Sequence, residues 1–174
     1  MREWLYLSEE RIILRQIEKS DFKYLKEILQ DEQLMLLGWG KVYPDNQVKL
    51  WIDKIMKQYV QYGYSYFVVE HKDTNEFIGI GGLIPTEIRS NDCTELAYII
   101  KQSYQGKGFG SEVARTFIKM AFNELNLHSV VAQLIPNNIA SKKVVEKIGM
   151  KYKFNYMRLQ NGNDREHLVY EIKN

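Results

Sequence analysis

The sequence predicts an α+β protein with one central, mixed but mostly antiparallel sheet and about four helices. Segments of β-rich composition are interspersed with segments whose apolar residues recur at helical spacing. Three β-rich segments follow one another in the middle of the chain, as in an antiparallel meander. No repeat, low-complexity tract or linker divides the 174 residues, so we expect one domain over residues 1–174.

The N-terminal part of the chain is expected to form a strand followed by two helices. Residues 11–16 have the composition of a short strand, and a capped amphipathic helix follows through about residue 30. After a loop with two glycines and a proline, a second helix is expected to begin at Asp45 or Asn46 and to stop at Gly63.

The remainder of the chain alternates between strands and two further helices. One helix follows the glycine-rich segment at residues 105–110, and another covers residues 138–148 and ends at Gly149. The polar stretch RSND is expected to separate two of the strands. These strands are expected at residues 66–70, 77–83, 94–100, 129–135, 151–159 and 167–172.

Charge, cysteine content and hydropathy exclude several functional classes. Lysine and arginine total 24 against 22 aspartates and glutamates, without a long block of one sign, which argues against nucleic acid as a partner. The single Cys93 excludes an internal disulfide, and the three histidines lie too far apart for a metal site. Since neither a signal peptide nor an apolar run of about 18 residues is present, we expect a soluble cytoplasmic protein without a membrane partner.

The segment QGKGFG, residues 105–110, stands at a predicted turn from a strand into a helix. The first turn of a helix presents amides without intrahelical partners and the positive end of the helix dipole, and glycines let a phosphate approach them. Lys107 is expected to add a cationic contact, whereas Ser111 and Glu112 also suit an ordinary helix start. The turn therefore indicates a backbone site for phosphate, with a ligand-free helix start as the alternative.

Two familiar phosphate motifs do not fit this turn. Gly108 is not followed by the Lys and Ser or Thr pair of a P-loop, so a nucleoside triphosphatase is disfavoured. Gly106, Gly108 and Gly110 form GxGxG rather than GxGxxG, and the strands before them look antiparallel, which disfavours a dinucleotide-binding fold.

A family resemblance rests on this turn and on a second segment. Gln105, Gly108 and Gly110 match the Q/R-x-x-G-x-G/A signature of the GCN5-related N-acetyltransferases (GNAT). Residues 137–150, NNIASKKVVEKIGM, resemble the NxxS…EKxGF segment of the ribosomal-protein N-terminal acetyltransferases of the RimJ and RimL type, with Met150 replacing the usual Phe. The order of predicted elements also resembles that family's acyl-CoA N-acyltransferase fold over nearly the whole chain.

The resemblance implies acetyl-CoA as a co-substrate and also implies where it binds. The coenzyme is expected between the strand at 94–100 and the strand at 129–135, which splay apart in this family. Asn138 matches an Asn beside the pantetheine arm and also suits a helix N-cap, and the two roles are compatible. The residues expected to bind the coenzyme, mostly through their backbone, are Tyr98, Ile99, Ile100, Gln105, Gly106, Lys107, Gly108, Phe109, Gly110, Ser111, Asn138 and Ser141.

Ser141 is also a candidate catalytic residue. Its hydroxyl falls on the otherwise apolar face of the predicted helix. It is expected either to bond to a carbonyl of the preceding turn or, by resemblance, to lie near the coenzyme sulfur. Many members of the superfamily carry a tyrosine acid four residues later, where this chain has Val145, so the general acid is left unassigned.

Glu95 is the candidate general base. It shares a strand face with Cys93, Ala97 and Ile99, small or apolar neighbours that would raise the pKa of its carboxyl. An exposed glutamate on an edge strand is the alternative. Cys93 itself is expected only to pack.

Aromatic and basic residues around the expected site allow two interpretations each. The family builds its acceptor pocket from the first helices and their loop, so Trp39, Tyr43 and Trp51 are expected either to line that pocket or to pack in an aromatic core. Side chains near the last predicted helix either touch the coenzyme phosphates or face solvent: Lys142, Lys143, Lys147 and Tyr152.

The functional hypothesis is an acyl-CoA-dependent N-acetyltransferase that moves an acetyl group directly to a primary amine. Such transfer requires a neutral amine, stabilisation of the oxyanion and a proton for the thiolate, and needs no nucleophilic side chain. The acceptor is expected to be a protein N-terminus, such as that of a ribosomal protein, or a small-molecule amine. A catalytically silent coenzyme-binding module and a nucleotide-phosphate binder are the alternatives, and the oligomeric state is open, with a homodimer among the options.

Overall fold

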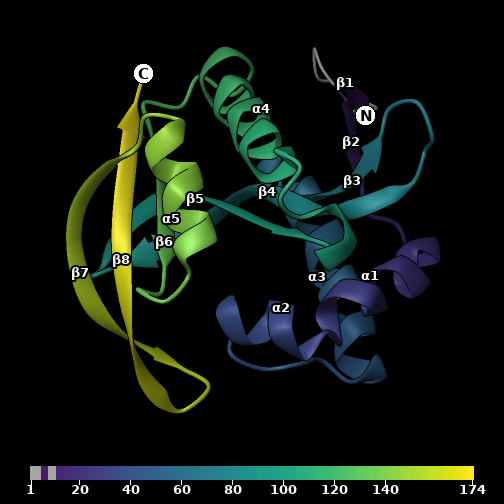
Figure 1. Ribbon diagram of the computed structural model, residues 1–174, viewed down its shortest axis with the longest axis horizontal. Helices are drawn as coiled ribbons and strands as arrows, with labels where there is room; N and C mark the ends of the chain where they lie inside the picture. Colours follow the sequence, from purple (N-terminus) through teal and green to yellow (C-terminus); the bar gives the residue numbers. More distant parts are fainter. Residues whose placement is uncertain (1–4, 8–10) are drawn as a thin grey trace.

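A computed structural model describes residues 5–7 and 11–174 of the chain. The described part forms one sheet of eight strands in the order β1-β2-β3-β4-β5-β6-β8-β7 (Figure 1). All neighbouring strands are antiparallel except β5 and β6, which are parallel. The expected fold class, a mixed and mostly antiparallel sheet with helices, is confirmed.

The helices and strands follow one another much as the sequence predicts. The strands are β1 Leu5–Leu7, β2 Ile12–Gln16, β3 Tyr66–His71, β4 Phe77–Ile88, β5 Asn91–Ile100, β6 Ser129–Leu134, β7 Lys151–Gln160 and β8 Asn163–Lys173. The α-helices are α1 Phe22–Leu29, α2 Glu32–Leu37, α3 Asp45–Tyr62, α4 Phe109–Asn123 and α5 Ile139–Lys147, and two 3-10 turns are η1 Lys19–Asp21 and η2 Gln102–Tyr104.

Three regions differ from the sequence prediction. No strand was expected at the position of β1, and the described chain has five α-helices rather than about four, because the short α2 forms between the first expected helix and the loop at Gly38, where no element was expected. Its start is capped by the Asp31 carboxylate, which accepts a hydrogen bond of 3.0 Å from the Leu34 amide. Strands β4 and β5 are also longer than expected and meet at Arg89 and Ser90, both with positive φ. A two-residue turn of this kind joins two antiparallel strands directly, so the polar RSND stretch is part of a hairpin and does not form a longer loop.

The helices cover both faces of the sheet and divide the core in two (Figure 1). On one face, α4 and α5 pack against β-strand side chains that include Leu14 and Phe67, with Phe117 of α4 fully buried. On the other face, α1, α2 and α3 pack around Val68 and Ile80. Because successive strand residues point to opposite faces, the two cores share the same strands.

The parallel pair β5 and β6 separates almost as soon as it forms. Only Glu95 and Val131 are in register between them, whereas β4 and β5 pair along their whole length. The backbone groups of β5 beyond Glu95 that face β6 are therefore left for another partner. The separation that the family resemblance implies is found at this place.

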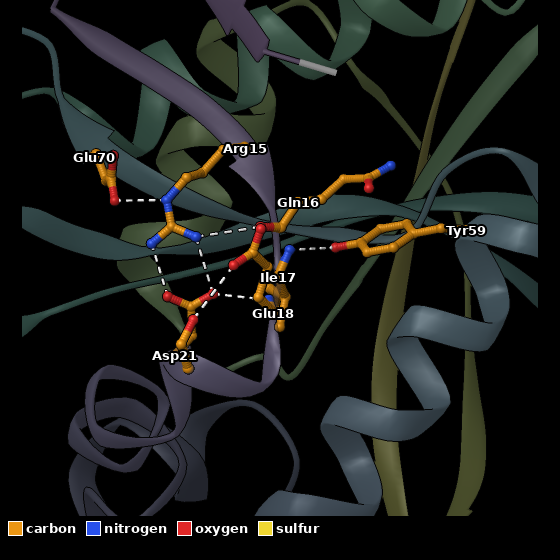
Figure 2. A network of polar contacts seen from close by, with 8 residues as sticks. Arg15, Gln16, Ile17, Glu18, Asp21, Tyr59 and Glu70 are labelled. Carbon is orange, nitrogen blue, oxygen red and sulfur yellow. Dashed lines mark hydrogen bonds and ion pairs between the residues drawn. The ribbon is translucent and has the colours of Figure 1, made fainter. Parts of the chain in front are cut away.

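An ion-pair network fixes the chain where β2 leads into η1 and α1 (Figure 2). The Arg15 guanidinium bonds to Asp21 at 2.7 and 2.9 Å and to Glu70 of β3 at 2.7 Å. Asp21 is buried and also accepts a hydrogen bond of 2.8 Å from the Glu18 amide. Each buried charge here has a partner of opposite sign, which is the condition under which such charges are tolerated.

Candidate active site

Two adjoining cavities lie where β5 and β6 separate. One, of about 470 Å³, is lined by five residues of the glycine turn and the start of α4 and by α5; the five are Gln105, Gly106, Gly108, Gly110 and Ser111. The other, of about 420 Å³, is lined by α3, β5 and β7. The two cavities share part of their lining, so they meet at a junction formed by Leu37, Gly38, Tyr98, Ile99, Asn138 and Ser141. We call the first the coenzyme cavity and the second the acceptor cavity.

The turn QGKGFG forms one wall of the coenzyme cavity. Gly106 and Gly108 have φ angles of 72° and 85°, in the left-handed region that favours glycine. Gly108 is the N-cap of α4, so the first amides of this 15-residue helix begin at the cavity wall. Lys143 contributes a cation from α5. An anion placed here meets free amides, the helix dipole and a lysine.

Most residues expected at the coenzyme do line this cavity, but two side chains do not. Lys107 donates from Nζ to the Ser103 carbonyl at 2.9 Å and lies over the Tyr104 ring. Phe109 packs into the core and is only 4% exposed. Neither residue is part of the cavity lining. The side chain of Gln105 is also occupied, since it donates to the Ile100 carbonyl at 3.0 Å.

Glu112 in the first turn of α4 is turned away from the anion site. It is buried and accepts hydrogen bonds from the Arg11 amide at 2.6 Å and from Arg11 Nε at 3.0 Å. Arg11 also donates to the Lys107 carbonyl at 3.1 Å and stacks over Phe109 at 4.0 Å. The pair anchors the glycine turn to β2. It also neutralises a carboxylate that would otherwise repel phosphate.

The junction of the cavities brings together three polar side chains. The Asn138 side chain accepts a hydrogen bond of 3.2 Å from the Ser141 amide, so its expected N-cap role is confirmed. In the described part of the chain, no backbone carbonyl accepts a bond from the Ser141 hydroxyl. The Tyr98 hydroxyl is buried without a hydrogen-bond partner there, and burial raises its pKa to about 12, partly offset by nearby Ser141. Hydroxyl groups with unused bonding capacity thus meet at the junction.

Glu95 lies on the wall of the acceptor cavity. Burial raises the pKa of its carboxyl, while a hydrogen bond of 3.0 Å from Gln133 and the charge of Arg158 oppose this shift. The Tyr156 hydroxyl in turn donates to Gln133. The edge-strand alternative is wrong, because β5 lies between β4 and β6 and pairs with β6 at Glu95 itself.

Aromatic side chains form a second wall of the acceptor cavity. Trp39 lies 5.4 Å from Tyr43 and 5.6 Å from Trp51 between ring centroids, and Trp51 lies 5.3 Å from Tyr66. All four residues line the cavity. The predicted aromatic packing of Trp39, Tyr43 and Trp51 is confirmed, and the rings also line this cavity, while their contact with an acceptor stays a prediction.

The sequence analysis did not predict several residues that line the acceptor cavity. Gln133, Arg158 and His167 reach it from β6, β7 and β8. The alternation of exposed and half-buried residues along β7 places Arg158 on its inner face. That alternation is visible in the sequence, but the direction in which the hairpin faces is not. Cys93, as expected, packs outside both cavities with a pKa raised to about 11 by burial.

Residues 5–7 and 11–174 lack two kinds of feature. They contain no cluster of three or more metal-binding side chains of the His, Cys, Asp or Glu type. None of their helices combines the length and apolar character needed to cross a membrane.

Comparison with known proteins places this fold and site in a family. The family model for the acetyltransferase (GNAT) domain matches residues 11–151. The chain belongs to the GNAT family and is an acyl-CoA-dependent N-acetyltransferase. The fold with its splayed strands and glycine turn is the arrangement that this membership implies.

Individual relatives agree with this assignment. YkkB of Bacillus subtilis is 31% identical over 146 residues, which cover 84% of this chain and 85% of that protein. The [Ribosomal protein uS5]-alanine N-acetyltransferase of Escherichia coli is 25% identical over 94% of this chain and 88% of its own. A GNAT-family acetyltransferase from Bacillus anthracis superposes with a TM-score of 0.83 at 23% identity, covering 98% of both chains.

Proposed function

We propose that this protein is a cytoplasmic enzyme that transfers an acetyl group from acetyl-CoA directly to a primary amine held in the acceptor cavity. The observation that carries this proposal is the junction, because a carbonyl from one cavity and an amine from the other would meet there. Holding two reactants in contact accounts for much of the acceleration in such transfers. The acceptor is either a protein N-terminus, as in the uS5-alanine relative, or a small amine.

The residues of the coenzyme cavity fit the chemical groups of acetyl-CoA. Gly106, Gly108 and the first amides of α4 suit a pyrophosphate, with Lys143 as a further cation. The unpaired side of β5 near Ile99 offers backbone groups to an amide-containing arm. When bound, acetyl-CoA supplies an activated acetyl thioester. These residues bind and orient it, and no protein nucleophile is needed.

Glu95 is proposed as the general base. An acceptor amine arrives protonated near neutral pH and must lose its proton before it attacks. Burial raises the pKa of Glu95, which makes its carboxylate a stronger base than an exposed glutamate. Gln133 and Thr86 both act as hydrogen-bond partners of the carboxylate and fix its position at the cavity wall, where the amine would approach it.

Ser141 is proposed to supply the proton at the sulfur. Its hydroxyl lies at the junction, beside the Tyr98 hydroxyl. Val145, which stands where many relatives carry a tyrosine, is 2% exposed and lines the acceptor cavity. Ser141 is therefore proposed for the role that the missing tyrosine leaves open, with the Tyr98 hydroxyl beside it.

The first experiment measures binding of acetyl-CoA by isothermal titration, with ATP as a control ligand. We expect binding of acetyl-CoA and none of ATP, and no binding at near-millimolar acetyl-CoA would refute the proposal. A nucleotide-phosphate binder would show the reverse. Thiol release over a panel of amines then separates an enzyme from a silent coenzyme-binding module, which gives no turnover.

A pair of matched variants locates the coenzyme site. Gly108→Ala and Gly63→Ala strain the backbone alike, since the φ angles are 85° and 83°. Only Gly108 lines the coenzyme cavity, whereas Gly63 ends α3. We expect Gly108→Ala to weaken acetyl-CoA binding about tenfold or more, which is about 1.4 kcal/mol, and Gly63→Ala to leave it unchanged. Equal binding by the two variants would place the coenzyme elsewhere.

The oligomeric state of the enzyme is a further part of the proposal. A homodimer is the assembly that we would test first, because cyclic dimers are the commonest soluble oligomers. Sedimentation equilibrium over a range of protein concentrations distinguishes it from a monomer.

A further inference from the structure

Arg158 on β7 stands out among the arginines of the protein. It is half-buried on the inner face of β7 and lines the acceptor cavity. Arg11, Arg15, Arg89 and Arg165 all donate hydrogen bonds to carboxylates, carbonyls or a side-chain amide. For Arg158, no hydrogen bond or ion pair to any residue of the described chain is found. A guanidinium with its five donors unused inside a cavity is suited to a planar anion.

The charges around the acceptor cavity favour an acceptor that carries an anionic group. Lys54 and Arg158 line the cavity with a single carboxylate, Glu95. His167 adds no charge near neutral pH, because burial lowers the pKa of its imidazole. A polyamine would bring a second ammonium group toward Arg158 with no further carboxylate to receive it. A carboxylate on the acceptor would instead satisfy the free guanidinium.

The hairpin of β7 and β8 encloses the acceptor cavity on one side. At its tip, Arg165 donates to the carbonyls of Leu36 and Gly38, the latter at 3.4 Å. Asn161 donates to the Trp39 carbonyl at 2.7 Å. Figure 1 shows this tip beside the end of α2. Because Gly38, Trp39 and Asn161 all line the cavity, the bridge is part of its wall and limits the space for a long peptide.

We propose that the acceptor is a small amine that also carries a carboxylate, with its amine at Glu95 and its carboxylate at Arg158. Trp39, Trp51 and Tyr66 would contact the apolar part of the molecule between these two groups. This inference rests on the proposed acetyl transfer and narrows its substrate class. The reaction forms the amide bond and breaks the thioester. One proton of the ammonium passes to Glu95, and the second proton lost from the nitrogen replaces the one that Ser141 gives to the departing sulfur.

The test compares acceptors that differ only in the carboxylate. Thiol release from acetyl-CoA is measured with the common L-amino acids, each beside its carboxamide, and with β-alanine and 4-aminobutyrate, which lengthen the separation of the two groups. Spermidine and short peptides complete the panel. We expect the best acceptor to be a carboxylate-bearing amine whose kcat/KM exceeds that of its carboxamide at least tenfold.

Variants of Arg158 connect this preference to the guanidinium. Arg158→Gln should raise KM for the best carboxylate-bearing acceptor by about 10- to 100-fold and change that of its carboxamide less than about twofold. Arg158→Lys keeps the positive charge but cannot donate two parallel hydrogen bonds to a carboxylate, so its KM for this acceptor should lie between those of the wild type and Arg158→Gln. Acetyl-CoA binding should be the same in all three proteins. An equal effect of Arg158→Gln on both acceptor forms would overturn the inference.

The outcomes separate this inference from the proposed function. If spermidine or a peptide is turned over and no carboxylate-bearing amine exceeds its carboxamide, the acceptor class is wrong and acetyl transfer stands. If acetyl-CoA binds and no amine releases thiol, both proposals fail.

Discussion

Two clusters of charged residues in this protein differ in whether their opposite charges form ion pairs. The Arg15 guanidinium donates hydrogen bonds to both Asp21 and Glu70 (Figure 2). Glu95 and Arg158 line one cavity and influence each other electrostatically, yet no ion pair joins them. The first cluster stabilises the fold because its charges are already satisfied. In the second cluster Glu95 accepts a hydrogen bond only from neutral partners and Arg158 has no bonded partner among the described residues, the arrangement on which the proposed acceptor site rests.

The largest effect is expected from removing the base in the second cluster. Glu95→Gln keeps the size of the side chain but leaves no group to take the proton of the amine, so kcat should fall about 10²- to 10⁴-fold. Thiol release measures the loss, and isothermal titration should show unchanged acetyl-CoA binding. A variant with the wild-type kcat would exclude Glu95 as the base.

The pH dependence of kcat gives an independent test of Glu95. Its carboxyl has a raised pKa, and only its deprotonated form can accept a proton. The rate should therefore fall as the pH is lowered through that pKa, at a higher pH than for an ordinary glutamate. In Glu95→Gln this decrease of kcat at low pH should be absent. A decrease that persists in the variant must come from the titration of another group.

A loss of stability is expected from breaking the first cluster. Asp21→Ala leaves the half-buried Arg15 without its main partner, so the free energy of unfolding should fall by about 3 kcal/mol. The control is Asp53→Ala, which removes an exposed ion pair of 3.8 Å with Lys19 and should cost less than about 1 kcal/mol. Denaturant unfolding measures both. Equal losses would mean that the Arg15 network adds no more than a surface pair.

A smaller effect on catalysis is expected at the junction. Ser141→Ala removes the proposed proton donor at the sulfur and should lower kcat about 10- to 100-fold, with little change in acetyl-CoA binding. Tyr98→Phe serves as the companion, because it removes a buried hydroxyl without a hydrogen-bond partner in the described chain. That variant should be at least as stable as the wild type. Full activity of Ser141→Ala would assign the acid elsewhere.

The smallest effect is expected on stability at Arg158. Because Arg158 has no bonded partner among the described residues, Arg158→Gln should change the free energy of unfolding by less than about 0.5 kcal/mol. Arg15→Gln should cost several times more, since it leaves buried Asp21 unpaired. Urea unfolding of the two variants compares the clusters directly. A large loss at Arg158 would reveal a structural role and weaken its assignment to a ligand.

Local features of the site were predictable from the sequence. Gly106, Gly108 and Asn138 adopt the turn and cap geometries that their positions predict, because a positive φ or an N-cap depends on close neighbours in the chain. The face of β5 on which Glu95 lies followed from alternation. Its central place in the sheet did not follow, since the partner β6 comes later in the chain.

The least predictable features were the side chains whose partners are distant in sequence. Lys107 was expected to contact phosphate but bonds to the Ser103 carbonyl. Phe109 was expected at the coenzyme, but its ring packs with Arg11 and His71 from the first strands. In both cases the direction of the side chain was not foreseen. That direction depends on how neighbouring elements pack.

Periodicity, glycine spacing and caps determined the class of fold, the order of its elements and the conformation of the glycine turn, because each depends on residues near one another in the chain. Tertiary packing decided which charges are satisfied. Arg15 meets Glu70 because β2 and β3 pair in one register, and Arg158 faces the acceptor cavity because β7 pairs with β8 and the hairpin tip bonds to the end of α2. Whether Arg158 has a bonded partner depends on how these elements pack together, and it cannot be deduced from any single segment of the sequence.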